Sequence, residues 1–333
     1  MKSISLPTGE QVYLGLVALA ADQEAAIAFI DPTQETRLEY DLTRIITRVQ
    51  TTNRMKIAVF SSLPVFGAAP VNMGMAGPQP GSEPWFFIQE LAKTYDLTKV
   101  QPDADRIDPT ADLLVLFHPR NMSDTIAFAV DQYILGGGNA IIFADPLSLM
   151  DDPRMGPGGS IPERLFKAWG ITMETGKAVV DYTYATQLRN RNNQVESNPM
   201  WLSAPASAFF AGNLITANLE SMLLPVAGAI EKLPDSVYTV EPLVQSSTNS
   251  VKVDAFSHNM NVNAIRRDFK PSGTIHNLAV RISGTFKTAF PDGKPEAEAK
   301  AGEPASETDA KVAEATLKEG KATSVIVVVA DSD

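Results

Sequence analysis

Four polar residues stand at the ends of four apolar runs, and their side chains are of the types that hydrolases use. These residues are Ser61, His118, Asp145 and Asp331. A serine hydroxyl, an imidazole and a carboxylate together perform acyl transfer, in which the histidine takes the proton of the serine. Ser61, His118 and Asp145 have the residue types of such a triad. All four residues are candidates for binding a ligand or a partner.

The sequence around Ser61 argues against catalysis. No G-x-S-x-G motif surrounds Ser61, and the following LPVFG does not begin a helix, so the turn that exposes a nucleophilic serine is not predicted. The chain contains no cysteine, which removes thiol nucleophiles, thiolate metal sites and disulfides. Polar residues at strand ends commonly bond loop amides or cap the next helix. We expect no enzymatic activity and no catalytic residue.

Motifs that bind metals or nucleotides are also missing. The three histidines are scattered and form no H-E-x-x-H pair, and no G-x-x-x-x-G-K-[ST] sequence is present. The GGGN at 136–139 closes a predicted helix, whereas phosphate-binding loops open one. Asp145, Asp331 and Asp333 would converge on a cation only if their strands were neighbours, and separately solvated carboxylates are the simpler interpretation. We expect no cofactor and no metal.

The four apolar runs predict the strands that position these residues. They lie at 55–60, 112–117, 139–145 and 324–331. Continuous apolarity is typical of strands that are covered on both faces, as in a parallel sheet. Ligands of such sheets bind at the carboxyl edge of the strands, where the four candidate residues are expected to cluster.

Helical patterns separate the first three runs and extend beyond them. Ser82 is predicted to cap a helix to about residue 95, Ser123 a helix that ends at Gly136, and Ser160 a short helix that ends at Gly170. Strands that alternate with helices predict an α/β fold. We expect a Rossmann-like, doubly wound, mostly parallel sheet with an N-terminal strand pair and a smaller C-terminal elaboration.

The composition changes along the chain predict five segments. Residues 1–52 are an N-terminal strand and helix extension, 53–177 the α/β sheet domain, and 178–290 an elaboration or second subdomain. Residues 291–320 are rich in Glu, Ala, Lys and Pro and contain almost no large apolar side chains, which is typical of a mobile acidic loop. Residues 321–333 return a strand to the sheet.

The overall charge and hydropathy restrict the partners. The formal charge of −11 repels phosphate backbones, so nucleic acid is not an expected partner. No window of 18 apolar residues is present, and the first residues lack the apolar stretch of a signal peptide. Both ends run directly into or out of strands, and we expect this sequence to be a piece of a longer protein.

The segment at 118–146, with its HP, DQ, GGG and FADP elements, resembles a known family. LFKAWGITMETGKAVVDYTYA at 165–185 and VIVVVADSD at 325–333 share the resemblance, which covers nearly the whole chain. The family is that of the gliding-motility-type ABC transporter auxiliary components. The resemblance implies a periplasmic or extracytoplasmic domain at the bacterial inner membrane, anchored by helices absent from this sequence. It also implies ABC permease and ATPase subunits as partners.

The resemblance therefore implies a non-catalytic auxiliary or substrate-recognition domain of an export system. The alternative is a small-molecule or glycan-binding protein that uses the crevice at the carboxyl edge, and a hydrolase is the least favoured interpretation. A deep pocket lined by His118 and the loop at 64–81 would favour binding of an exported or other small molecule. A broad apolar patch would favour an interaction module.

Overall fold

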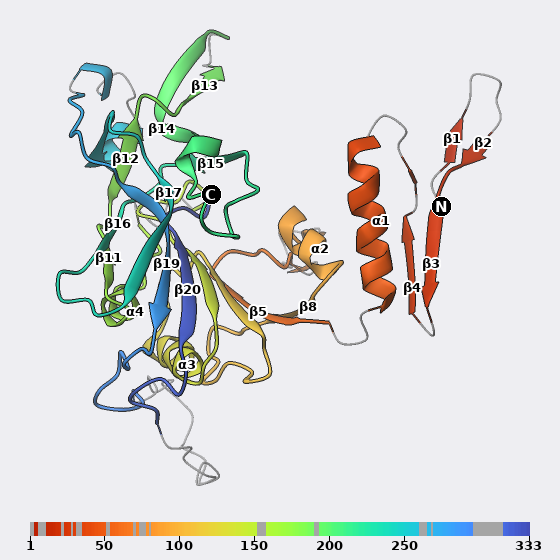
Figure 1. Cartoon of the computed structure of the whole chain (residues 1–333), viewed down its shortest axis with the longest axis horizontal. Coiled ribbons are helices and arrows are strands. Elements are labelled where there is room, and N and C mark those ends of the chain that lie inside the picture. Colours follow the sequence, from red (N-terminus) through yellow and green to blue (C-terminus); the bar gives the residue numbers. More distant parts are fainter. Residues whose placement is uncertain are drawn as a thin grey trace. The chain divides into compact units, whose positions relative to one another are not determined.

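The chain forms two compact units (Figure 1). The computed structural model describes residues 3–5, 11–20, 23–27, 29–30, 35–50, 54–68, 71–72, 78–79, 81–151, 158–189, 193–259, 265–267, 269–295 and 316–333. Unit 1 comprises Met1–Lys56 and Pro84–Leu97, and unit 2 comprises Ile57–Glu83 and Thr98–Asp333.

The described residues of unit 1 form two antiparallel strand pairs and two helices. Its elements are β1 (Ser3–Ser5), β2 (Gln11–Tyr13), β3 (Leu16–Ala20), β4 (Gln23–Ile27), α1 (Glu35–Gln50) and α2 (Phe86–Ala92). Ile45 and Val49 of α1 are four residues apart and lie on one face of the helix, where they form a small core with Ala25 of β4. The predicted extension at 1–52 thus contains strands and a helix, and its boundary stays a prediction.

Unit 2 contains most of the strands. Its elements are β5 (Lys56–Ser61), β6 (Val71–Asn72), β7 (Pro78–Gln79), β8 (Asp96–Lys99), β9 (Leu113–Phe117), α3 (Asp124–Leu135), β10 (Ala140–Phe143), α4 (Glu163–Ala168), β11 (Ile171–Met173), β12 (Lys177–Asp181), β13 (Ala185–Arg189), β14 (Val195–Pro205), the 3-10 helix η3 (Ala206–Ala208), β15 (Ser221–Pro225), β16 (Ile230–Lys232), β17 (Thr239–Gln245), β18 (Ser250–Asp254), α5 (Ala255–Asn259), β19 (Asn277–Gly284) and β20 (Ser324–Val329). β5 and β8 begin at the boundary between the units. The four predicted apolar strands are confirmed as β5, β9, β10 and β20.

These four strands are parallel neighbours within a nine-stranded sheet. The strand order is β11-β16-β19-β20-β10-β9-β5-β8, and β17 also pairs with β19. β5, β9, β10 and β20 run parallel, whereas β19 is antiparallel to β20, and β16 and β17 are antiparallel to β19. β10 and β20 are direct neighbours although their sequences are far apart.

The two faces of this sheet pack against different partners. Alternate residues of β9 and β10, such as Leu116 and Ile142, pack with Ile126 of α3 and Phe166 of α4 in the largest core. Residues that point the other way, such as Val327 of β20, belong to a second core. Its other members include Leu202, Ala204 and Leu224 of the antiparallel strands β14 and β15.

The fold is therefore a mixed α/β structure with one helix-covered face. The predicted doubly wound, mostly parallel Rossmann-like arrangement is not confirmed. Among the described residues the second face of the sheet is covered by strands, and the sheet also has an antiparallel part made of β11, β16, β17 and β19. The short apolar pieces at 178–290 form these additional strands, which is why this region lacks long helical patterns.

The predicted helix ends are partly confirmed. The hydroxyl of Ser123 accepts a hydrogen bond from the backbone N–H of Ile126, and α3 ends at Gly136. The predicted cap at Ser82 is wrong, because α2 begins at Phe86 and Ser82 instead bonds Ala68. The predicted cap at Ser160 is also wrong, because its hydroxyl bonds another loop.

Two predicted loops lie partly or mainly outside the described residues. In the loop at 64–81, residues 69–70, 73–77 and 80 are outside them, and the described parts include the short pair β6 and β7. In the predicted acidic loop at 291–320, residues 296–315 are outside them. The predicted mobility of that loop therefore stays a prediction.

Candidate functional site

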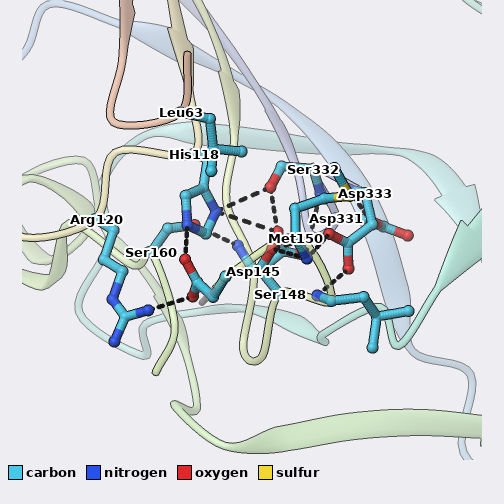
Figure 2. Close-up of polar contacts among 12 residues, drawn as sticks. Leu63, His118, Arg120, Asp145, Ser148, Met150, Ser160, Asp331, Ser332 and Asp333 are labelled. Carbon is cyan, nitrogen blue, oxygen red and sulfur yellow. Dashed lines mark hydrogen bonds and ion pairs between the residues drawn. The ribbon is translucent and has the colours of Figure 1, made fainter. Parts of the chain in front are cut away.

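A polar cluster lies at the carboxyl ends of the parallel strands (Figure 2). His118 follows β9, Asp145 follows β10 and Asp331 follows β20, and these three strands are neighbours in the sheet. Because parallel strands all end at the same edge, their next polar residues meet there. The structure brings these three predicted residues together.

His118 is fully buried and has a backbone conformation that few residues adopt. Its φ angle of 50° lies in the left-handed region, which costs free energy in a residue other than glycine. Its backbone N–H donates to the carbonyl of Phe143 at 3.0 Å, and its carbonyl accepts from the hydroxyl of Ser62. These bonds to β10 and to the end of β5 hold the strained residue in place.

The imidazole of His118 lies between a hydroxyl and two carboxylates. Nδ1 is 3.1 Å from Oγ of Ser332 and 3.5 Å from Oδ2 of Asp145. Nε2 is 3.0 Å from Oδ1 of Asp151, whose Oδ2 pairs with Arg120 at 2.5 Å. Burial disfavours the imidazolium, but the hydrogen bond to Asp145 and the charges of Asp151 and Asp145 outweigh burial and raise the pKa of His118.

Asp145 is fixed by backbone as well as side-chain bonds. Its carboxylate accepts from the backbone N–H of Ser332 at 3.1 Å and from the Ser332 hydroxyl. Its backbone N–H donates to Oγ of Ser160 at 2.8 Å, and its carbonyl accepts from the N–H of Ser160 at 2.9 Å. A Cβ at Gly159 would lie only 2.5 Å from the carbonyl oxygen of Asp145, so the loop approaches this closely only with glycine there.

Asp331 and Asp333 complete the cluster with two more carboxylates. Oδ1 of Asp331 accepts from the N–H of Asp333 at 2.9 Å, and Asp333 accepts from Oγ of Ser148 and the N–H of Leu149, both at 2.8 Å. Burial and the charge of Asp145 raise the pKa of Asp331 well above its usual value and the pKa of Asp333 to about 6. One oxygen from each of Asp145, Asp331 and Asp333 lies within 4.8 Å of the others.

The fourth predicted residue, Ser61, does not join these bonds. Its hydroxyl accepts from the backbone N–H of Leu63 at 3.1 Å, as in a local turn. The neighbouring Ser62 reaches His118 instead. The hydroxyl beside His118 is that of Ser332, which is only 5% exposed. The Ser61, His118 and Asp145 set is thus not assembled as a triad.

Sequence reasoning missed several members of this network, and four of them lie beside His118 or Asp145. They are Arg120, Asp151, Ser160 and Ser332. Ser332 lies between the two aspartates that follow β20, so its proximity to Asp331 was a usable signal. Asp151 lies in a loop rich in Asp, Pro and Gly, where no pattern predicts which carboxylate turns toward the sheet. The binding roles proposed for Ser61, His118, Asp145 and Asp331 stay predictions.

A separate pocket opens beside the antiparallel strands. It has a volume of about 580 Å³, and its lining includes Ile230, Val251, Lys252, Ile275 and His276. None of the four predicted site residues lines it. This pocket is therefore not the deep pocket beside His118 that would favour binding of a small molecule.

Comparisons with known proteins identify the family. A family model described as an ABC-type uncharacterized transport system matches residues 54–333. No curated protein matches the chain. Among the described residues, no helix combines the length and the hydropathy that crossing a membrane requires. Since the match spans most of the sequence, the chain belongs to this family of ABC-type transport auxiliary components.

Proposed function

We propose that this chain is a non-catalytic, extracytoplasmic auxiliary or substrate-recognition domain of a gliding-motility-type ABC export system. In this proposal the longer protein is anchored at the inner membrane and works beside the permease and ATPase subunits. The observation that carries the proposal is the family match over residues 54–333, which includes the whole polar cluster.

The burial of the polar cluster supports a non-catalytic role. A nucleophilic serine must reach its substrate, but the Ser332 hydroxyl is buried and already donates to Asp145. His118 is also fully buried, and its two ring nitrogens already have polar neighbours. These bonds link the loops after three strands to one another, and such links stabilise the fold.

An exposed apolar segment supports a role in protein–protein contact. Phe210, Leu214, Ile215 and Leu219 lie within residues 210–219, between η3 and β15, and all four are exposed. Leu214 is 95% exposed. Apolar side chains gathered this way mark interaction sites. We infer that this segment, 210–219, contacts the permease, which is the membrane-embedded partner in the proposed function.

Site-specific crosslinking tests this contact. A photoreactive amino acid at position 214 of the membrane-anchored full-length protein should crosslink to the permease. The matched control is position 237, because Val237 is also apolar and 84% exposed but lies in a different loop. Equal crosslinking from both positions would contradict a contact at 210–219. Failure to recover any permease or ATPase with the purified protein would contradict the transport role itself.

The absence of cysteine gives a direct test of the membrane side. Val237→Cys introduces a single thiol at an exposed position outside the segment proposed to contact the permease. A maleimide that cannot cross membranes should label it in intact spheroplasts as fully as after lysis. A buried position, Val328→Cys, is the control that should react only after denaturation. Labelling at position 237 only after lysis would place the domain in the cytoplasm.

Substrate recognition at the carboxyl edge is tested in a cell-based export or motility assay. We expect His118→Ala and Asp145→Ala to reduce activity, whereas Lys93→Ala should not. Each variant must first show a normal thermal transition, because both site residues are buried. Full activity of the folded edge variants would remove the recognition role from this edge.

A second candidate function is small-molecule or glycan binding, which the pocket near His276 favours. Its apolar lining with Lys252 and His276 is typical of ligand sites. A bulky substitution, Ile275→Trp, should block binding of an exported compound there if this pocket is used.

A further inference from the structure

The three carboxylates at the end of β10 and β20 are arranged like the ligands of a metal ion. Oxygens of Asp145, Asp331 and Asp333 lie within 4.8 Å of one another. Two ligands of one ion are separated by at most twice the metal–oxygen distance, which is about 4.6–5.2 Å for Ca²⁺ and about 4.0–4.2 Å for Mg²⁺. The 4.8 Å limit falls within the range for two ligands of one Ca²⁺ ion and exceeds the range for Mg²⁺.

An unpartnered atom points to a ligand in the same place. Asp331 is 3% exposed, and its Oδ2 has no hydrogen-bond partner among the described residues. A buried carboxylate oxygen without a partner loses its hydration without compensation, which costs free energy. A bound cation would supply the missing partner. We propose that Asp145, Asp331 and Asp333 bind one divalent cation of the oxygen-preferring class, with Ca²⁺ as the best fit.

The surrounding bonds hold the proposed ligands in position. Ser332 bonds Asp145 through its N–H and hydroxyl, and the N–H of Leu149 and the hydroxyl of Ser148 bond Asp333. Carboxylate oxygens have two lone pairs each, so these bonds leave capacity for a metal. Supporting bonds of this kind are typical of metal sites.

The local charges also favour a cation. The charged neighbours of Asp331 are the carboxylates of Asp145 and Asp333, and the charged neighbour of Asp333 is Asp145. His118 faces Asp145 from β9, while Arg120 is paired with Asp151. Asp333 is exposed, which gives an ion a path from solvent. This inference concerns binding alone and does not depend on the transport role.

Thermal denaturation of the purified chain tests the proposal. Chelator-treated protein is heated with CaCl₂ or MgCl₂ added through the millimolar range, where extracellular calcium modules bind. We expect a saturable rise in the melting temperature of about 5 °C at 100 times the Kd of Ca²⁺. Isothermal titration with CaCl₂ should give one site per chain.

Isosteric variants locate the site. Asp331→Asn should abolish the response to Ca²⁺, because it replaces one carboxylate ligand with a neutral amide. Asp333→Asn provides a second variant in case Asp331→Asn does not fold, and Asp235→Asn is the exposed control that should respond like the wild type. The absence of any response of the wild type to either ion would overturn the proposal. So would an unchanged response of both site variants.

Discussion

At the residue scale, Asp131 is a buried carboxylate that fastens α3 to the segment after β19. It accepts from the hydroxyl of Thr288 at 2.7 Å and from the backbone N–H of Ala289 at 2.8 Å. Burial raises the pKa of Asp131, although these bonds oppose the shift. The carboxylate therefore loses hydration on folding, and its hydrogen bonds hold the segment at Thr288, which follows it by more than 150 residues.

Removing this carboxylate should destabilise unit 2. We expect Asp131→Ala to lower the free energy of unfolding by about 3 kcal/mol, because Thr288, Ala289 and the side-chain amide of Gln132 lose their acceptor. Asp131→Asn is the matched control and should cost less, since its amide oxygen still accepts from Ala289. Urea unfolding followed by circular dichroism measures both variants. Equal losses for the two would show that the charge, and not the hydrogen bonding, matters.

His276 should make stability depend on pH. Burial, followed by the charge of Lys252, lowers the pKa of His276 below 6.5, although Glu231 and Asp181 oppose this shift. Between the lowered pKa and 6.5, the unfolded chain binds a proton that the folded chain does not. The free energy of unfolding therefore falls as the pH falls through this range.

A His276→Gln variant isolates this effect. As the pH is lowered from 7.5 to about 5, the free energy of unfolding should fall more for the wild type than for the variant. Above pH 7.5 the difference should stay constant, because His276 is neutral in both states there. A difference that is the same at every pH would contradict the assignment.

At the scale of elements, the end of α3 depends on glycine. Gly136 closes the helix, and Gly137 has a φ angle of 100°. The GGGN segment is therefore a helix-ending turn, as its position between a helix and a strand predicted. It directs the chain from α3 into β10, the strand that carries Asp145.

Replacing Gly137 should strain this turn without a clash. A Cβ there would meet Ala322 at an ordinary 3.7 Å, so the cost comes from the backbone conformation alone. We expect Gly137→Ala to lower the free energy of unfolding by about 1 kcal/mol and Gly137→Asn to cost less, because asparagine tolerates positive φ. Urea unfolding of both variants measures this. A wild-type value for Gly137→Ala would disprove the strain.

At the scale of the whole molecule, the cores of the two units are made from separate residues. The small core of Ala25, Ile45 and Val49 lies in unit 1, and the large cores described above lie in unit 2. A chain that begins at Arg54, where the family match begins, should therefore keep the main thermal transition within about 3 °C of the intact chain. Differential scanning calorimetry of both chains measures this. Loss of the main transition would show that unit 2 needs residues 1–53.

The strands that could be predicted are those with continuous apolar sequences. β5, β9, β10 and β20 are recognisable because both of their faces are buried. Their parallel pairing places His118, Asp145 and Asp331 together, as expected from the position of each at a strand end. The strand-covered second face was not predictable, because most of β12 to β18 mix polar with apolar residues, and their apolar residues do not reveal which sheet they join.

Local capping rules failed where a side chain had a distant partner. Ser160 has the sequence position of a helix cap, but its hydroxyl accepts from the N–H of Asp145, which is 15 residues away. Ser61 has the position of a nucleophile, but it bonds its own turn, and Ser62 bonds His118. Such choices depend on which loops meet in space, and the sequence alone does not contain that information.

The position of β20 has a consequence for biosynthesis. β20 lies between β10 and β19, yet it is translated after both of them. Until the ribosome has passed residue 329, β10 and β19 each have an unpaired edge in the middle of the future sheet. Unpaired edges of this kind are prone to wrong pairing. Pairing in the middle of the sheet is therefore delayed until the last described strand has been synthesised. A chaperone that shields strand edges would act during this interval.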